Sequence, residues 1–345
     1  MPGHENGQAS GMPPRRLTRD ELAILESRPK TKVQKFLDYV VCFLPVVAGC
    51  VALWEYNFLP DLQGNVHGND YNWFILALTG LALIGFFASF CGRRAFLWMR
   101  YKAPFYTFVF LALAGYDWLT LKTGSLPLPY FPWIDQMLEA AVADWAYLLD
   151  CAKNSLILLF TGYFIGVGAG LVTGIACGYN RNVNYWIEPF TRLLGAIPST
   201  TWLPVVMVLA ATLFRGSVFI IALGVWYSVT IATKTGITNI DHAYFEAART
   251  LGVKGIRLVG TIAVPSALPN ILQGMTQGMS TACVALMVAE MIGVESGLGW
   301  YITWQKSWAR YGNMYAAVVA ICVIFVLVNA LLGAIRRYVL RWQER

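Results

Sequence analysis

The sequence predicts an all-α protein that crosses a membrane several times. Hydrophobic residues make up 57% of its 345 residues and charged residues only 13%, which is too apolar for a soluble domain of this length. About eight stretches are long and apolar enough to span a bilayer, which takes roughly 20 residues each. Nearly all charges lie between or at the ends of these stretches, with Asp117 the main exception. Because backbone polar groups find no water in lipid, helices must fill the stretches.

The predicted spans divide into an accessory group and a core. We expect a tail and short helix at 1–35, an accessory three-span segment at 36–125, a linker at 126–154, and a five-span core at 155–345. The Pro-rich passage 127–132 marks the boundary between the two groups. The spans are expected near 39–57, 73–91, 104–121, 155–178, 193–214, 217–235, 266–290 and 314–335.

Lysine and arginine are distributed unevenly between the two sides of these spans. Most of the 26 Lys and Arg residues lie before the first span, within 93–102, at 181 and 192, around 234–257, and after 335. The positive-inside rule therefore predicts that both termini are cytoplasmic and that the linker 126–154 is extracytoplasmic. The same cytoplasmic excess accounts for the net charge of +7, so no nucleic-acid partner is expected.

The first core span, 155–178, contains a glycine at every fourth position. The ladder is formed by Gly162, Gly166, Gly170, Gly174 and Gly178. Residues four apart share one helix face, and small residues let membrane helices approach closely. We expect the ladder to pack against another span, with exposure of its backbone to a pore as the alternative.

The second core stretch, 193–214, combines prolines with hydroxyl side chains. Pro198 is followed by Ser199, Thr200 and Thr201, and then by Pro204. Proline removes a backbone hydrogen bond, so the helix should be distorted here. Distorted backbone at membrane depth is tolerated where it is buried in protein or lines a wet cavity. These residues are candidates for lining a path through the membrane, and a simple packing kink is the alternative.

A polar loop at 241–265 separates the spans 217–235 and 266–290. Its candidate functional residues are Glu246, Ala247, Ala248, Gly252, Lys254, Arg257 and Pro265. The two alanines let a helix approach a partner closely, and the glycine is expected to end that helix. The Lys and Arg keep the next turn polar, and the proline suits the start of a helix, where a missing N–H costs nothing.

The spacing in this loop resembles the EAA loop of permease subunits of binding-protein-dependent ABC importers. Glu-Ala-Ala at 246–248 is followed after three residues by Gly252, after nine more by Ile262, and then by Pro265. In that family the loop forms short cytoplasmic coupling helices that sit in a cleft on the ATPase subunit. The resemblance covers about residues 150–340 and implies a type I ABC importer permease core.

Two further stretches are similar to the permeases for nitrate, sulfonates and taurine. One is Pro198-x-x-x-Trp202-x-Pro204, where that group more often has Pro-Leu-Ala at 199–201, and the other is Gly-Leu-Gly-Trp at 297–300. The resemblance implies a homodimer of permeases with two ATP-binding subunits, which hold the ATP and Mg²⁺, and an extracytoplasmic solute-binding protein. No cofactor is expected on this chain. The expected location is the bacterial cytoplasmic (inner) membrane, and the expected cargo is a small anion such as nitrate, a sulfonate or taurine.

The span 266–290 has a polar stripe. The stripe is formed by Gln273, Thr276, Gln277, Ser280 and Thr281, and Gly274 and Gly278 belong to a neighbouring stripe of small residues. Polar side chains inside a membrane helix face protein or water rather than lipid. We predict that they line the translocation path, with interhelical hydrogen bonding as the alternative. Glu290 closes the span near the outer surface, where it caps a gate, meets a partner or is solvated.

Other functions fit the residues less well. Without a G-x-x-x-x-G-K-[ST] loop, the chain is expected to be a transport subunit rather than the ATPase. A secondary transporter or passive channel is the alternative, but we expect the core spans to hold no mid-membrane ionisable residue before Glu290 and no Lys or Arg to bind an anion. The seven cysteines form no C-x-x-C pair and the three histidines are scattered, so neither a metal site nor an intramembrane active site is expected.

Overall fold

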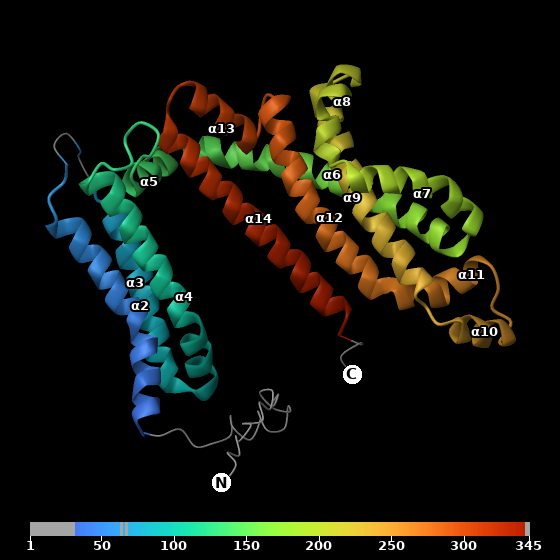
Figure 1. Ribbon diagram of the computed structural model, residues 1–345, viewed down its shortest axis with the longest axis horizontal. Helices are drawn as coiled ribbons and strands as arrows, with labels where there is room; N and C mark the ends of the chain where they lie inside the picture. Colours follow the sequence, from blue (N-terminus) through green and yellow to red (C-terminus); the bar gives the residue numbers. More distant parts are fainter. Residues whose placement is uncertain (1–31, 63–64, 66–67, 342–345) are drawn as a thin grey trace, which may run out of the picture. The chain divides into compact units, whose positions relative to one another are not determined.

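The computed structural model describes residues 32–62, 65 and 68–341, and in these ranges it contains helices but no strand (Figure 1). The predicted all-α polytopic fold is confirmed. Most of the tail and short helix predicted at 1–35 lies outside the described residues. The helices are α2 (Lys32–Phe58), α3 (Asp70–Cys91), α4 (Arg93–Asp117), η1 (Trp118–Lys122), α5 (Ile134–Ala143), α6 (Trp145–Tyr179), α7 (Arg181–Ala196), η2 (Ser199–Trp202), α8 (Leu203–Leu209), α9 (Leu213–Thr238), α10 (His242–Thr250), α11 (Ile256–Leu258), η3 (Val259–Ala263), α12 (Val264–Ile292), α13 (Leu298–Ser307) and α14 (Tyr311–Val339).

Among the described residues, six helices are long and apolar enough to cross a membrane, and a bent pair qualifies when its two parts are taken together. About eight spans were predicted, and the structure differs from that prediction in two stretches. The stretch 104–121 is helical in α4 and η1, but α4 begins at Arg93 and contains Arg100 and Lys102, so it is less apolar than the six candidate helices. The stretch 193–214 is broken after Ala196, and the helices on either side of the break differ in direction by 92°.

The chain divides into two compact units, and each is described by itself. One unit comprises residues up to Pro60 together with Asn72–Trp118, and the other comprises Asp61–Tyr71 and Leu119–Arg345. The boundaries predicted at 125 and 154 remain predictions.

In the unit with α2, α3 and α4, an ion pair with a buried carboxylate joins two helices. Asp38 of α2 is 5% exposed and pairs with Arg100 of α4 at 2.7 Å. Gly49 of α2 lies so close to α3 that a Cβ atom there would collide with the hydroxyl of Thr79. Most side chains of α3 are exposed and apolar, which suits contact with lipid.

Within the larger unit, polar contacts hold the loop Asp61–Tyr71 in place. Lys122 is buried and pairs with Asp61 at 2.7 Å. The carboxylate of Asp135, at the start of α5, accepts the backbone N–H groups of Gly68 and Tyr71 at 2.6 and 3.0 Å. These contacts join residues 61–71 to residues 122 and 135, more than 60 positions later in the sequence, so the loop is part of this unit's fold.

The core of the larger unit is formed by α6, α9 and α12. The five ladder glycines of α6 lie against α9, and a Cβ atom at any of them would come within 2.6–2.8 Å of α9 atoms. Gly274 and Gly278 of α12 also face α9, toward Ala232 and Val225. Helix α9 therefore packs against two small-residue faces, which allow the three helices to approach one another closely.

A polar cluster joins the start of α6 to α13 and α14. The Tyr301 hydroxyl and the Asn313 amide both donate to Oδ2 of Asp144, at 2.8 and 2.7 Å. Burial is the main reason that the pKa of Tyr301 is raised to about 12.

Glu290 is buried at the end of α12, so the solvated alternative is wrong. Its side chain is 1% exposed, and Oε2 accepts the N–H of Gly299 at 2.7 Å. Ser155 of α6 accepts the neighbouring N–H of Leu298 at 2.9 Å. These donors belong to the first turn of α13 and have no partner within the helix. A side chain at Gly297, where φ is +109°, would collide with the carboxylate, so the Gly-Leu-Gly sequence lets the chain pass directly over Glu290.

Candidate functional site

The break between α7 and α8 is centred on Pro198. Ile197 and Pro198 have extended ψ angles of 115° and 140°, and η2 then begins at Ser199. Pro204 occupies the first turn of α8, where its missing N–H is harmless. The distortion predicted from the two prolines is present, and Pro198, Ser199 and Thr200 line a cavity together with residues of α9 and α12.

A cavity of about 430 Å³ lies between the break, α9 and α12. Six of the predicted path residues line it, namely Pro198, Ser199, Thr200, Gln277, Ser280 and Thr281. The other lining residues are Leu194, Leu223, Gly224, Tyr227, Ser228 and Val284. Hydroxyl and amide groups therefore come from three separate segments, and the lining contains no charged side chain.

Three predicted path residues lie away from this cavity. Thr276 donates to the carbonyl of Leu272 in its own helix at 2.9 Å, and Gln273 accepts a hydrogen bond from Arg336 of α14. Thr201 is exposed in η2 but is not part of the lining. The polar stripe on α12 extends beyond the cavity toward the start of the helix. There, Gln273 bonds to another helix and Thr276 bonds within α12, so interhelical hydrogen bonding, the alternative interpretation, applies to Gln273.

The four cavity residues on α9 were missed from the sequence, namely Leu223, Gly224, Tyr227 and Ser228. Gly224 lies so close to the opposite walls that a Cβ atom would be 2.9 Å from both Ser199 Oγ and Thr281 Cγ2. Tyr227 lies one turn further on and reaches α7, where its hydroxyl is 2.6 Å from the position of a Cβ atom on Gly195. The i, i+3, i+4 spacing of Gly224, Tyr227 and Ser228 is a signal that could have indicated this face.

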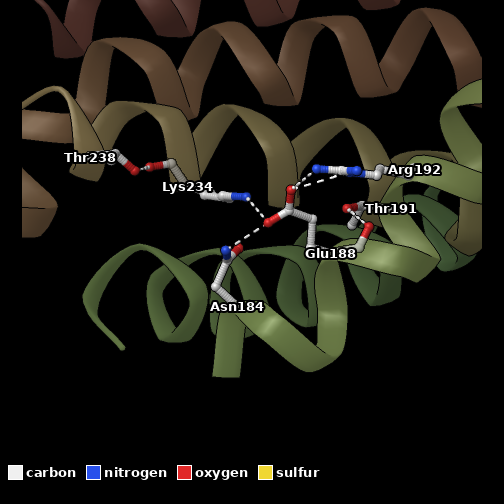
Figure 2. A network of polar contacts seen from close by, with 6 residues as sticks. All are labelled: Asn184, Glu188, Thr191, Arg192, Lys234 and Thr238. Carbon is white, nitrogen blue, oxygen red and sulfur yellow. Dashed lines mark hydrogen bonds and ion pairs between the residues drawn. The ribbon is translucent and has the colours of Figure 1, made fainter. Parts of the chain in front are cut away.

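A charged network joins α7 to α9 (Figure 2). Glu188 of α7 accepts from Asn184 at 2.8 Å and from Arg192 at 2.6 Å, and its Oε2 lies 3.5 Å from Nζ of Lys234 of α9. The expectation that the core spans lack a Lys or Arg is thus wrong. Lys234 belongs to the continuous helix α9, which extends to Thr238.

The first half of the loop 241–265 is a capped helix. Asp241 accepts the N–H of Ala243 at 3.0 Å and starts α10, in which Glu246 and Ala247 are exposed and Ala248 is buried. At the other end, Val253 N–H bonds to the Ala248 carbonyl and Gly252 N–H to that of Arg249, both at 3.0 Å. These two bonds define a Schellman motif, and Gly252 has the positive φ, +82°, that its C′ position requires.

The second half of the loop leads without interruption into α12. Gly255, which was missed from the sequence, has φ +59° and starts α11, and η3 connects α11 to α12 with Pro265 in the first turn. Lys254 and Arg257 are exposed. Leu251 and Ile256 are 83% and 91% exposed, which is unusual for aliphatic side chains on a polar loop. The loop therefore presents an apolar and basic surface.

The described part of the chain brings no three His, Cys, Asp or Glu side chains together in a way that could hold a metal ion. The loop, the cavity and the charged network are the functional candidates described above.

Comparison with known proteins places the second half of the chain. A family model described as "Binding-protein-dependent transport system inner membrane component" matches residues 166–345. The chain is 29% identical over 107 residues to a putative aliphatic sulfonates transport permease protein, SsuC, of Bacillus subtilis (strain 168). These residues cover 31% of this chain and 39% of SsuC. The chain is also 26% identical over 114 residues to the bicarbonate transport system permease protein CmpB of Synechococcus elongatus, and these residues cover 33% of this chain and 41% of CmpB.

The matched part of the chain therefore spans less than half the length of these two curated relatives. A solved structure of the MetNI methionine ABC transporter in an inward-facing conformation aligns with 57% of this chain and 98% of the other, with 19% identity and a TM-score of 0.49.

Proposed function

This chain belongs to the family of binding-protein-dependent transport system inner membrane components, and on that premise we propose that it is the permease subunit of an ATP-driven importer. The observation that most supports coupling to an ATPase is the exposed loop 241–265. It joins α9 to α12, the two helices that provide most of the cavity lining. Because α11, η3 and α12 form one continuous helical stretch, Ile256–Ile292, a displacement of the loop would move the cavity wall directly.

The proposed importer contains several further subunits. Two ATP-binding subunits would hold ATP and Mg²⁺ and receive the apolar and basic loop surface, one on each of two permease copies. A solute-binding protein would deliver cargo from outside. In this arrangement the chain is a multi-pass protein of a bacterial inner membrane, and both termini and the loop are cytoplasmic, as the Lys and Arg distribution favours.

We propose that the cargo is a small anion and that the cavity is part of its path. The lining offers hydroxyl groups of Ser199, Thr200 and Ser280 and the amide of Gln277 but no fixed charge. Such neutral donors bind an anion weakly, as a path that must release its cargo requires. The names of the sulfonate and bicarbonate relatives support an anion, and the resemblance to nitrate and taurine permeases agrees with this class.

The importer assignment predicts that an ATPase co-purifies with the chain. The tagged protein would be extracted from its native membrane in mild detergent, and its companions identified by mass spectrometry with and without cross-linking. We expect an ATP-binding subunit in the wild-type sample and a weaker signal for Glu246→Ala, because the exposed Glu246 lies in the proposed contact. If the chain is recovered alone even after cross-linking, a secondary transporter or passive channel becomes the better assignment.

The cavity assignment predicts that filling it blocks transport. Gly224→Val places a branched side chain between Ser199 and Thr281, so uptake should fall by at least about tenfold while the ATPase still co-purifies. Gly333→Val on α14 is the matched control, because a Cβ atom there meets nothing within 4 Å. Unchanged uptake by the Gly224 variant, with both variants well folded, would show that cargo does not pass through this cavity.

A further inference from the structure

The network around Glu188 contains more positive than negative charge. One carboxylate receives Arg192 through both Nε and Nη2, at 3.2 and 2.6 Å, and Lys234 at 3.5 Å (Figure 2). Asn184 adds a neutral donor at 2.8 Å. The two cations therefore converge on a single anionic group, and one unit of positive charge is not balanced within the network. The longest contact is that with Lys234, the member of the network on α9.

The network lies beside the cavity and at the loop end of α9. Lys234 is seven residues after Tyr227, so both occupy the same face of α9 about 10 Å apart along the axis. Tyr227 lines the cavity and also touches α7 next to Gly195, one turn beyond Arg192. Four residues after Lys234, α9 ends and the chain enters the loop. An anion that leaves the cavity along this face of α9 would approach Lys234 before the helix ends.

We propose that Lys234 and Arg192 form an anion-binding site at the cytoplasmic exit of the cavity, which the carboxylate of Glu188 occupies until an anionic cargo displaces it. The inference rests on the proposed function, because it assigns a role to this site in anion release. Carboxylate, sulfonate and bicarbonate groups all present oxygen atoms to Arg and Lys in similar geometry, so exchange between them conserves the hydrogen bonds. When cargo departs, Glu188 returns and prevents the cations from retaining it.

The Arg192–Glu188 part of the network is too exposed to contribute much to stability. The Arg192 side chain is 79% exposed, and Arg192 and Glu188 form an i,i+4 pair on one helix. Ion pairs of this kind contribute little to stability, because water and salt screen them. The side chain of Lys234 is 26% exposed and that of Glu188 31%, so both remain accessible to a small anion. Substitutions in the network should therefore leave folding intact.

Equilibrium binding of radiolabelled sulfate to the purified full-length chain in detergent, at low ionic strength, tests the site. Glu188→Gln removes the competing carboxylate but keeps the side chain's shape, so we expect sulfate binding to tighten about tenfold. Adding Lys234→Gln to that variant should abolish the gain, whereas Lys234→Arg should retain it. Lys306→Gln, an exposed lysine of α13, is the control and should leave binding unchanged.

Equal sulfate binding by wild type, Glu188→Gln and the double variant would overturn the proposal and leave the network with a purely structural role. This assay needs no ATPase, so it is independent of co-purification, which tests the importer assignment. In the complete transporter reconstituted in vesicles, Lys234→Gln should slow uptake without weakening capture of the loaded binding protein. A chain that binds sulfate as expected but recruits no ATPase would retain the anion site and lose the importer assignment.

Discussion

Replacing Gly252 by proline should abolish ATP-driven uptake while the chain remains inserted in the membrane. The φ angle of Gly252 is +82°, whereas proline is restricted to about −65°. Proline would also remove the N–H that bonds to the Arg249 carbonyl at 3.0 Å. The Schellman turn must then open, and α10 can no longer present Glu246 and Ala247 in their present orientation. Uptake in reconstituted vesicles and co-purification of the ATPase should fall together.

A graded series separates the turn from general damage to the loop. Asparagine tolerates positive φ and should retain most activity at position 252, whereas alanine pays roughly 1 kcal/mol for the left-handed conformation and should be intermediate. Gly260→Ala is the control in the same loop, because its φ is not positive and a Cβ atom there meets nothing within 4 Å. Normal uptake by Gly252→Pro would refute the role of this loop in coupling.

The features predicted well from the sequence depend on short-range patterns. Helices in lipid follow from local apolarity, and the glycine ladder follows from a repeat of four, so neither requires knowledge of distant residues. The break at Pro198 likewise follows from two prolines within seven residues. The number of spans was overestimated, because Arg100 and Lys102 make α4 less apolar than the six candidate helices and the break turns one expected span into a bent pair.

The features missed from the sequence depend on contacts between distant residues. Glu188 and Lys234 are 46 residues apart, and nothing near either residue indicates the other. Glu290 was placed correctly at the end of a span, but its burial depends on the chain folding back at Gly297–Gly299 and on Ser155 of another helix. Likewise, the polar stripe on α12 led to the prediction of Gln273 and Thr276 as path residues, although only Gln277, Ser280 and Thr281 of the stripe line the cavity. Periodicity identifies a helix face, but it does not show how far along that face a cavity extends.

Gly166→Leu should prevent the larger unit from folding. A Cβ atom at this position would lie 2.6 Å from the backbone carbonyl oxygen of Ala222 and 2.7 Å from Cβ of Val225, both in α9. Neither atom can move without displacing the α9 backbone, and α9 is also packed against α12 through Ala232 and Gly274. Overpacking of this kind costs roughly 1–3 kcal/mol for small additions, and a leucine adds four carbon atoms. We expect loss of the monodisperse peak in size-exclusion chromatography.

Gly168→Leu provides the matched control, because Gly168 is exposed on the same helix and a Cβ atom there meets nothing within 4 Å. Leucine has a higher helix propensity than glycine and is favourable toward lipid, so this variant should fold at least as well as the wild type. The pair changes the same residue types two positions apart, and therefore composition and hydrophobicity are identical. If Gly166→Leu folds as well as Gly168→Leu, the close approach of α6 to α9 is not required for folding of the core. The ladder could then expose its backbone to a pore.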